Sequence, residues 1–254
     1  MKLMTKTSLL LAAMVSTTAA MAQTAAPAPD YTLAFNVGAV SDYRYRGIAQ
    51  TSFKPAIQAG VDFSHKSGVY AGAWVSNVNW IKDYVGATEG ATEVDLYGGY
   101  KGEIAKDLGF DVGLITYQYP SNTADKAGYA NANTTEIYGA LTYGIVTAKY
   151  SHSTGTFMAN NNSSGSGYFE LAAGFDLGNG MTLTPHIGRQ VIPGQAGNAG
   201  DYTDFSLTFA KDFGNGLVAT ASAIGTDAKD SFYKVGSYDN LGRNALVVGL
   251  KYSF

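Results

Sequence analysis

The last ten residues, 245–254, read A-L-V-V-G-L-K-Y-S-F. Taken alternately, Leu246, Val248, Leu250, Tyr252 and Phe254 fall on one face, and the residues between them are smaller or more polar. Because side chains of a strand alternate between two faces, this segment is predicted to be a strand with one apolar face. Such a face would be covered by a second layer in a water-soluble protein or would contact lipid in a membrane barrel.

The composition favours strands over helices. The chain has 254 residues with 31 Gly, 18 Tyr and 12 Phe, only 15% charged residues and no Cys. Gly and aromatic residues at this level suit twisted strands with aromatic anchors. The absence of Cys excludes disulfides and thiolate metal sites. A net charge of −3 argues against a nucleic-acid partner, which would need a basic face.

The N-terminus resembles an export signal. Lys2 and Lys6 precede a short apolar core at 8–15, and the small residues at 20–22 form a cleavage pattern. We therefore expect residues 1–22 to be a signal peptide, 23–30 a flexible linker and 31–254 the folded domain. Removing the signal peptide takes away two lysines and no acid, which brings the net charge to −5. No other segment has the apolar length of a transmembrane helix.

Alternation recurs along the whole mature chain. We identify twelve runs of about ten residues with period two, each bounded by turn residues. These runs are 31–46, 56–65, 69–78, 92–102, 109–119, 135–143, 146–153, 167–177, 181–190, 204–213, 217–226 and 245–254. Pro185 lies inside one of them and cannot donate a ladder hydrogen bond, so a bulge or bend is expected there.

Short and long connections alternate between these runs. Tight connections follow runs two, four, six, eight and ten, and two of them contain Asn-Gly, a strong hairpin signal. The other connections, at 47–55, 79–91, 120–134, 154–166, 191–203 and 227–244, are long and rich in Gly, Asn and Ser. In an outer-membrane barrel the periplasmic turns are short and the extracellular loops are long. The pattern therefore predicts an all-β fold, a membrane-spanning antiparallel up-and-down barrel of twelve strands.

Aromatic residues lie near both ends of the predicted strands, as interfacial belts would require. The predicted periplasmic belt consists of Phe63, Phe110, Tyr143, Phe175, Phe213 and Phe254. The predicted belt at the other end consists of Trp80, Tyr117, Tyr119, Phe169, Tyr202 and Phe205.

Strand phase places charged residues inside the barrel, where water tolerates them and lipid would not, at about 2–4 kcal/mol for a Lys or Arg at the midplane. The candidate pore-lining acids are Asp42, Asp62, Glu93, Asp95, Asp111, Glu136, Glu170 and Asp204. The candidate pore-lining bases are Arg44, Arg46, Lys101, Lys149 and Lys251. The excess of acids would favour cations in a pore. Alternatively, the charges could pair across a narrow interior and let little water pass.

The stretch from Asp42 to Arg46 alternates in polarity. As part of a strand it would point Asp42, Arg44 and Arg46 inward and Tyr43 and Tyr45 toward the membrane interface. The two arginines would then form a constriction or, as we prefer, hold the first strand in register by ion pairs.

Catalysis has little support in the sequence. The three histidines are His65, His152 and His186, and His152 points away from the adjacent Ser151 if both lie on a strand. No H-E-x-x-H, G-x-S-x-G or P-loop motif is present. We expect no enzyme activity, no cofactor and no metal.

Three stretches resemble the TorF family of porins. They are S-D-Y-R-Y-R-G-I-A-Q-T at 41–51, S-G-V-Y-A-G-A-W-V-S-N-V at 67–78 and E-V-D-L-Y-G-G-Y at 93–100. The resemblance is close over 33–120 and looser to the end, and it implies an outer-membrane barrel. It also implies that Phe254 is the terminal aromatic residue read by the barrel-insertion machinery.

From these features we expect a channel in the Gram-negative outer membrane for passive diffusion of small hydrophilic solutes, with a preference for cations. The first alternative is a non-conducting outer-membrane barrel with a structural role or with loops that bind partners. The second is a soluble periplasmic barrel that binds a ligand.

Overall fold

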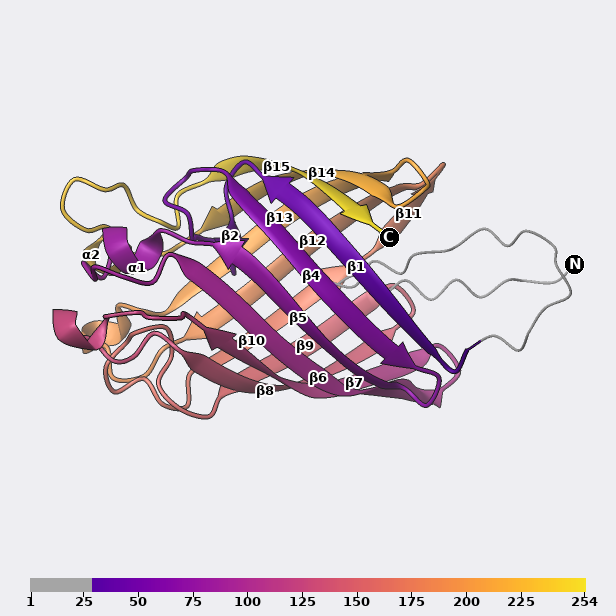
Figure 1. Cartoon of the computed structure of the whole chain (residues 1–254), viewed down its shortest axis with the longest axis horizontal. Coiled ribbons are helices and arrows are strands. Elements are labelled where there is room, and N and C mark those ends of the chain that lie inside the picture. The colour runs from indigo at the N-terminus through magenta and orange to yellow at the C-terminus, as the bar shows by residue number, and fades with distance from the viewer. Residues whose placement is uncertain (1–28) are drawn as a thin grey trace, which may run out of the picture.

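The structure is a computed structural model that describes residues 29–254, so the predicted signal peptide and most of the linker lie outside the described residues. It is a barrel of steeply tilted strands with loops gathered at one end (Figure 1). Its wall strands are β1 (Tyr31–Val40), β4 (Ala56–His65), β5 (Val69–Asn77), β6 (Thr92–Ala105), β7 (Leu108–Gln118), β8 (Thr134–Tyr143), β9 (Val146–Ser153), β10 (Gly167–Ala173) with β11 (Phe175–Gly178), β12 (Met181–Val191), β13 (Tyr202–Asp212), β14 (Leu217–Thr226) and β15 (Ala245–Ser253).

The sheet closes on itself. Each wall strand pairs antiparallel with its neighbours in sequence, and β1 also pairs with β15 from Asn36↔Ser253 to Val40↔Gly249. Because β10 and β11 together form one wall strand, the barrel has twelve strands, which confirms the predicted fold class. Runs 56–65, 146–153 and 217–226 match β4, β9 and β14 to the residue.

The outer surface of the barrel is apolar. Leu246 is 72% exposed and Phe254 63% exposed on the closing strand, and the alternation predicted for that strand is confirmed. Other strands contribute further exposed side chains, among them Leu33, Ile57, Leu96, Leu114, Ile137, Phe169, Ile187 and Phe205. So large an exposed apolar band requires a nonaqueous surrounding.

The two ends of the barrel differ. The turn end carries the short hairpins at 66–68, 106–107, 144–145, 179–180 and 213–216. Asn179 and Gly180 both have positive φ, 52° and 71°, as a type I′ turn requires. The loop end carries six long connections: L1 (41–55), L2 (78–91), L3 (119–133), L4 (154–166), L5 (192–201) and L6 (227–244). The predicted alternation of short and long connections is therefore present.

Five of the six loops contain short regular elements. L1 holds the strand pair β2 (Arg44–Tyr45) and β3 (Ile48–Ala49), and L2 holds α1 (Trp80–Asp83). L3 and L5 hold the 3-10 turns η1 (Asp125–Ala127) and η2 (Ala196–Asn198), and L6 holds α2 (Asp230–Tyr233). Within residues 29–254, no helix has the length and apolar character needed to cross a membrane.

Pro185 does not interrupt its own strand; the break lies in the neighbouring strand. β12 is continuous through Pro185, which is exposed on the outer face. The interruption lies in the neighbouring strand at Gly174, between β10 and β11 and one residue past the position opposite Pro185. The register is unchanged across the break, from Ala172↔His186 to Phe175↔Leu183. The expected bulge at Pro185 is therefore absent, because only the missing N–H affects the ladder.

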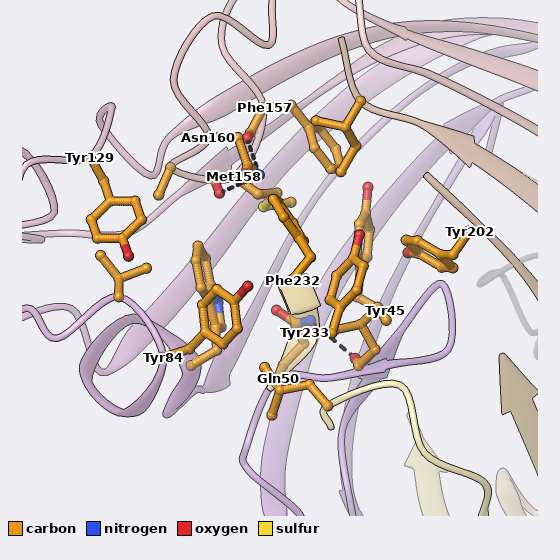
Figure 2. Close-up of a pocket in the computed structure, with 16 residues that line it drawn as sticks. Tyr45, Gln50, Tyr84, Tyr129, Phe157, Met158, Asn160, Tyr202, Phe232 and Tyr233 are labelled. Atoms are coloured by element: carbon orange, nitrogen blue, oxygen red, sulfur yellow. Dashed lines mark hydrogen bonds between the residues drawn. The ribbon is translucent and has the colours of Figure 1, made fainter. Parts of the chain in front are cut away.

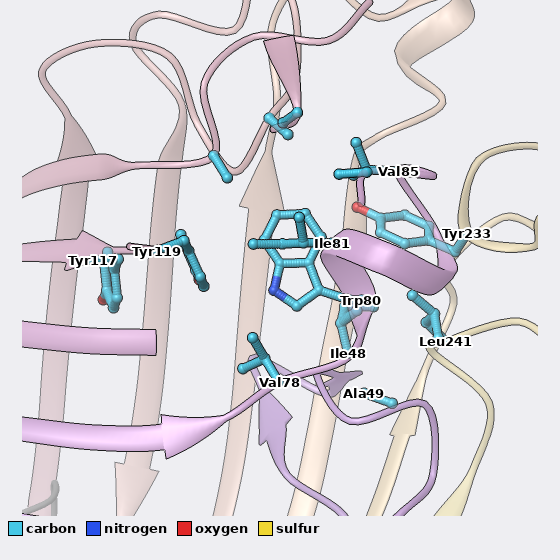
Figure 3. Packing of buried hydrophobic residues seen from close by; sticks show 14 of the residues in the cluster. Ile48, Ala49, Val78, Trp80, Ile81, Val85, Tyr117, Tyr119, Tyr233 and Leu241 are labelled. Atoms are coloured by element: carbon cyan, nitrogen blue, oxygen red, sulfur yellow. The ribbon is translucent and has the colours of Figure 1, made fainter. Parts of the chain in front are cut away.

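The apolar core lies in the loops. Buried side chains from L1, L2, L3, L4 and L6 pack together across the loop end, as Figure 3 shows for Ile48, Trp80, Ile81, Tyr119 and Leu241. We call this assembly the cap.

Candidate pore lining and loop-end cap

L1 folds into the barrel instead of extending the first strand. β1 ends at Val40, and the chain turns inward to form the β2–β3 hairpin, whose turn residues Arg46 and Gly47 have φ of 49° and 80°. Gly47 is required there because a Cβ atom would lie 2.9 Å from Cβ of Asp204. The predicted strand 31–46 was thus too long, since its alternating polarity belongs to a hairpin.

The positions of Tyr43 and Tyr45 correct the second part of that prediction. Neither faces the membrane interface. The Tyr43 hydroxyl donates to Oε1 of Glu93 at 2.6 Å, and the Tyr45 ring packs edge-to-face on Tyr117 with centroids 5.3 Å apart. Both rings point into the barrel because the hairpin carries them there.

Arg46 crosses the lumen to the far wall. Its guanidinium donates to both carboxylate oxygens of Glu136, at 3.1 and 2.7 Å, and to Oε1 of Gln190 at 2.8 Å. It also lies 4.2 Å from the centroid of the Tyr168 ring. Because Glu136 and Gln190 are fully buried, this bidentate pair is a strong attachment only while both partners remain in place.

Arg44 ties L1 to L6. Its Nη1 donates to the carbonyl oxygens of Gly47, Leu241 and Arg243 at 2.9–3.0 Å, and its Nε pairs with Asp42 at 2.6 Å. Burial raises the pKa of Asp42, which lies outside the membrane-spanning strands, while the Arg44 guanidinium opposes that shift. Neither arginine sets the register of β1, so our preferred interpretation of them was wrong.

Glu93 anchors the cap from the wall. It accepts the hydroxyls of Tyr43 at 2.6 Å and Tyr119 at 2.7 Å, which joins L1 and the start of L3 to β6. Trp80 packs edge-to-face on Tyr119, 5.4 Å between centroids. Polar contacts at the wall thus hold an apolar assembly above them.

A polar cavity of about 790 Å³ lies inside the barrel. Eleven of the thirteen candidate residues line it: Asp42, Arg44, Arg46, Asp62, Asp95, Lys101, Asp111, Lys149, Glu170, Asp204 and Lys251. The other two, Glu93 and Glu136, point inward but are buried under the L1 hairpin that they hold.

Tyrosines and glycines build one side of this cavity. Gly99 of β6 and Gly113 of β7 are paired, and across them the hydroxyls of Tyr70 and Tyr138 meet in a hydrogen bond. A Cβ atom on Gly113 would lie 2.6 Å from the Tyr138 hydroxyl, so only glycine leaves room for the ring. The Tyr70 hydroxyl also donates to Asp111 at 2.5 Å.

Two lysines cover these rings. Nζ of Lys101 lies 5.4 Å from the Tyr70 centroid, and Nζ of Lys149 lies 4.5 Å from the Tyr138 centroid. These are cation–π distances. The basic residues on this wall are therefore already engaged with aromatic side chains.

The adjoining wall, from β10 to β13, carries a compact acid–histidine group. His186 Nε2 lies 3.1 Å from Oε2 of Glu170, and its Nδ1 lies 3.5 Å from Oδ1 of Asp204. The Tyr168 hydroxyl donates to Asp204 at 2.9 Å. His186 therefore faces the lumen, between acids from the two neighbouring strands.

The other two histidines lie apart from this group. His65 contacts Ser67 at the turn end, and His152 lies beside Tyr150. Within residues 29–254, no three histidine or acidic side chains are grouped so that they could hold a metal ion.

A small apolar pocket of about 70 Å³ opens within the cap (Figure 2). Tyr84 of L2, Phe157 of L4 and Phe232 and Tyr233 of L6 line it, and Tyr45 of L1 also contributes to its wall. The sequence analysis did not find this pocket, because its residues come from all six loops, whose contacts no local pattern reveals.

Four residues of the predicted outer belt belong to the interior instead. Trp80, Tyr117, Tyr119 and Tyr202 are buried, whereas Phe169 and Phe205 are exposed as predicted. The alternation along each strand already indicates that Tyr117 and Tyr202 point inward. Tyr117 lies an even number of residues from Asp111, and Tyr202 lies two residues from Asp204, so each ring shares a face with an acid that was predicted to point inward.

The family model that matches this sequence covers residues 24–254 and is described as "Bacterial protein of unknown function (Gcw_chp)". The chain belongs to the Gcw_chp family. No protein with a curated function matches its sequence.

Solved structures share the fold of this Gcw_chp protein. A KdgM porin superposes with a TM-score of 0.54 at 6% identity, over 87% of this chain and 99% of its own. A NanC porin gives a TM-score of 0.54 at 10% identity, over 88% of this chain and 99% of its own. A second KdgM structure, titled as a complex with disordered oligogalacturonate, gives a TM-score of 0.52 at 6% identity, over 87% and 98%. Identities this low establish a common fold only.

Proposed function

We propose that this protein is a channel of the Gram-negative outer membrane through which small hydrophilic solutes diffuse, with a preference for cations. The observation that carries the proposal is the cavity of 790 Å³, lined by charged and hydroxyl groups and enclosed by a closed barrel whose outside is apolar. A barrel of twelve strands is wider than the eight-stranded barrels that side chains fill. The turn end then faces the periplasm and the loop end the outside.

Two similarities to known porins support the proposal. The fold is that of the KdgM and NanC porins, and three sequence stretches resemble the TorF porins. The lumen of this protein carries more acids than bases, whereas one KdgM structure is titled as a complex with oligogalacturonate, an acidic sugar. Eight acids and five bases point inward here, so the field inside favours positive solutes.

The cap sets the conductance in this proposal. Arg46 holds the L1 hairpin across the lumen, and the apolar contacts of L2 and L6 lie above it. Solute flow is therefore restricted while L1 is docked, and it increases when Arg46 separates from Glu136.

Recordings from purified protein in a planar bilayer test this proposal. We expect small conductance steps for the wild type and, in a KCl gradient, a reversal potential on the cation side. Asp62→Asn combined with Asp111→Asn should move that potential toward zero, because both acids line the cavity. Absence of steps both in the wild type and after release of L1 would contradict a channel.

The cap itself favours a second candidate, a non-conducting barrel whose loops bind partners. The specific observation is the dry packing of Ile81, Ala124 and Ala132, which are fully buried across the loop end. This candidate predicts that the cap stays closed in every variant that folds. Conductance of an L1-released variant separates the two candidates.

A further inference from the structure

Asp95 stands apart from the other charged side chains of the lumen. It is only 6% exposed, yet its Oδ1 is buried without a hydrogen-bond partner among the described residues. It also takes part in none of the ion pairs of residues 29–254. A buried carboxylate without a partner is costly, so a native site of this kind needs an explanation.

Its neighbours on the same face are satisfied. Glu93, two residues earlier on β6, accepts two tyrosine hydroxyls, and Asp62 accepts from Tyr97 and from Asn36. Two basic side chains of the lumen are paired with other acids, Lys149 with Glu170 and Arg46 with Glu136. Within residues 29–254, no basic side chain forms an ion pair with Asp95.

Aromatic rings surround the unpaired acid. In the sheet register Asp95 lies directly opposite Trp74 of β5 on one side and Tyr117 of β7 on the other. Tyr43 of the L1 hairpin packs edge-to-face on Trp74 with centroids 5.3 Å apart. All four residues line the cavity of the lumen.

We propose that Asp95, Trp74, Tyr117 and Tyr43 form a binding site for the ammonium group of a small organic cation that enters the lumen. The carboxylate supplies charge and hydrogen-bond acceptors, and the rings supply cation–π contacts, for which Trp is the best donor. A bare divalent metal fits poorly, because it needs about six oxygen ligands and one carboxylate stands alone here. The site depends on the proposed function in one respect: the channel is the route by which the cation reaches Asp95.

The two tryptophans of the chain give a direct readout. They are Trp74 and Trp80, so a Trp80→Phe background leaves Trp74 as the single indole, beside Asp95. The indole nitrogen of Trp80 has no hydrogen-bond partner in the part of the chain that the structure describes, so this change removes only packing there. Fluorescence of purified protein is titrated with n-butylammonium chloride, and with 1-butanol and sodium butyrate as the neutral and anionic probes at matched ionic strength.

We expect a saturable change with n-butylammonium and none with the other two probes. Asp95→Asn should weaken the binding at least about tenfold, since a charge-assisted contact is lost. Asp176→Asn is the control, because Asp176 is exposed at the turn end, lies outside the cavity and accepts from the backbone amide of Gly178. It should leave the affinity within about twofold of that of the background, because the contacts of the site are unchanged.

Equal affinity in the Asp95→Asn variant, or an equal response to 1-butanol, would overturn the site. An absent response in the Trp80→Phe background, with a heat-shifted gel band showing a folded barrel, would overturn it as well. Planar-bilayer recordings of the same preparations separate the two proposals. Conductance without n-butylammonium binding rejects the site and keeps the channel. Binding without conductance, when conductance is also absent after release of L1, rejects the channel and keeps the site.

Discussion

The cap and the cavity below it belong to the same twelve-stranded barrel, yet the side chains of the cap are tightly packed whereas those of the cavity surround open space. In the cap, side chains from five loops exclude water, and Ile81 and Tyr119 are as buried as residues in a soluble core. In the cavity, tyrosine hydroxyls and carboxylates surround open space of 790 Å³. The strands alone thus make a hollow barrel, and the loops decide whether its loop end is open. L1 is the only one of the six loops seen to pass between the two regions, since its Arg46 reaches the far wall.

The largest effect is expected from Arg46→Ala, because release of L1 would open the cap to the cavity below it. It leaves Glu136 buried without its cation, so L1 should leave the lumen and conductance should rise several-fold. The free energy of unfolding should fall by up to about 3–5 kcal/mol, less whatever local opening of L1 recovers. Planar-bilayer recording and urea titration measure the two effects. Arg189→Ala, which removes an exposed arginine on the outer side of β12, is the control. A conductance equal to that of the wild type would show that L1 does not close the barrel.

Ile81→Ala should loosen the cap without touching the cavity. Ile81 is fully buried, and truncating such a residue costs about 2–5 kcal/mol. Backbone amides of L2 should exchange faster with deuterium, while those of β6 and β7 keep their protection. Ile104→Ala, at a side chain that is 61% exposed at the turn end, should change neither. Uniformly faster exchange in both regions would mean that the cap and barrel unfold together.

Gly113→Ala should disturb the cavity wall without opening the cap. The new Cβ would lie 2.6 Å from the carbonyl oxygen of Gly98 and from the Tyr138 hydroxyl, and such overpacking costs about 1–3 kcal/mol. Gly139→Ala is the matched control, because its nearest neighbour would be 4.0 Å away. Unfolding in urea compares the two variants. Equal stability would show that the tyrosine hydroxyls of this wall adapt freely.

The smallest effect on stability is expected from deletion of Phe254, which belongs to neither region. Its ring stacks on Phe35 and Tyr252 at the turn end, and it is 63% exposed. Refolded protein should lose no more than about 1–2 kcal/mol, whereas the amount in the outer membrane of cells should fall sharply. Normal membrane levels of the truncated protein would remove Phe254 as an assembly signal.

Much of the wall could be predicted because local patterns determine it. Period two placed Asp111 and Lys251 inside and Leu250 outside, and Asn179-Gly180 located a turn to the residue. The cap could not be predicted in this way. Arg46-Gly47 is a turn signal that the surrounding alternation concealed, and the Arg46–Glu136 contact joins residues 90 apart in sequence.

The tyrosine wall needed one further kind of information. Tyr70 meets Tyr138 only because Gly99 and Gly113 are paired in the sheet between them. A single sequence gives the phase of each strand but not the register between strands. Parity could still have placed Tyr117 and Tyr202 inside, because each shares its phase with a predicted inward acid on the same strand.

The seam between β1 and β15 has a consequence for the order in which the molecule forms. Its ladder joins five residue pairs, against ten between β1 and β4, and it connects segments more than 200 residues apart. Every other wall contact is made between sequence neighbours, so the chain loses the most entropy at this step and gains the fewest backbone bonds there. The hairpins should therefore assemble first and the barrel should close last. Arg44 connects L1 and L6, the loops that flank this seam. The docking of L1 therefore also stabilises the closed seam once β1 and β15 have paired.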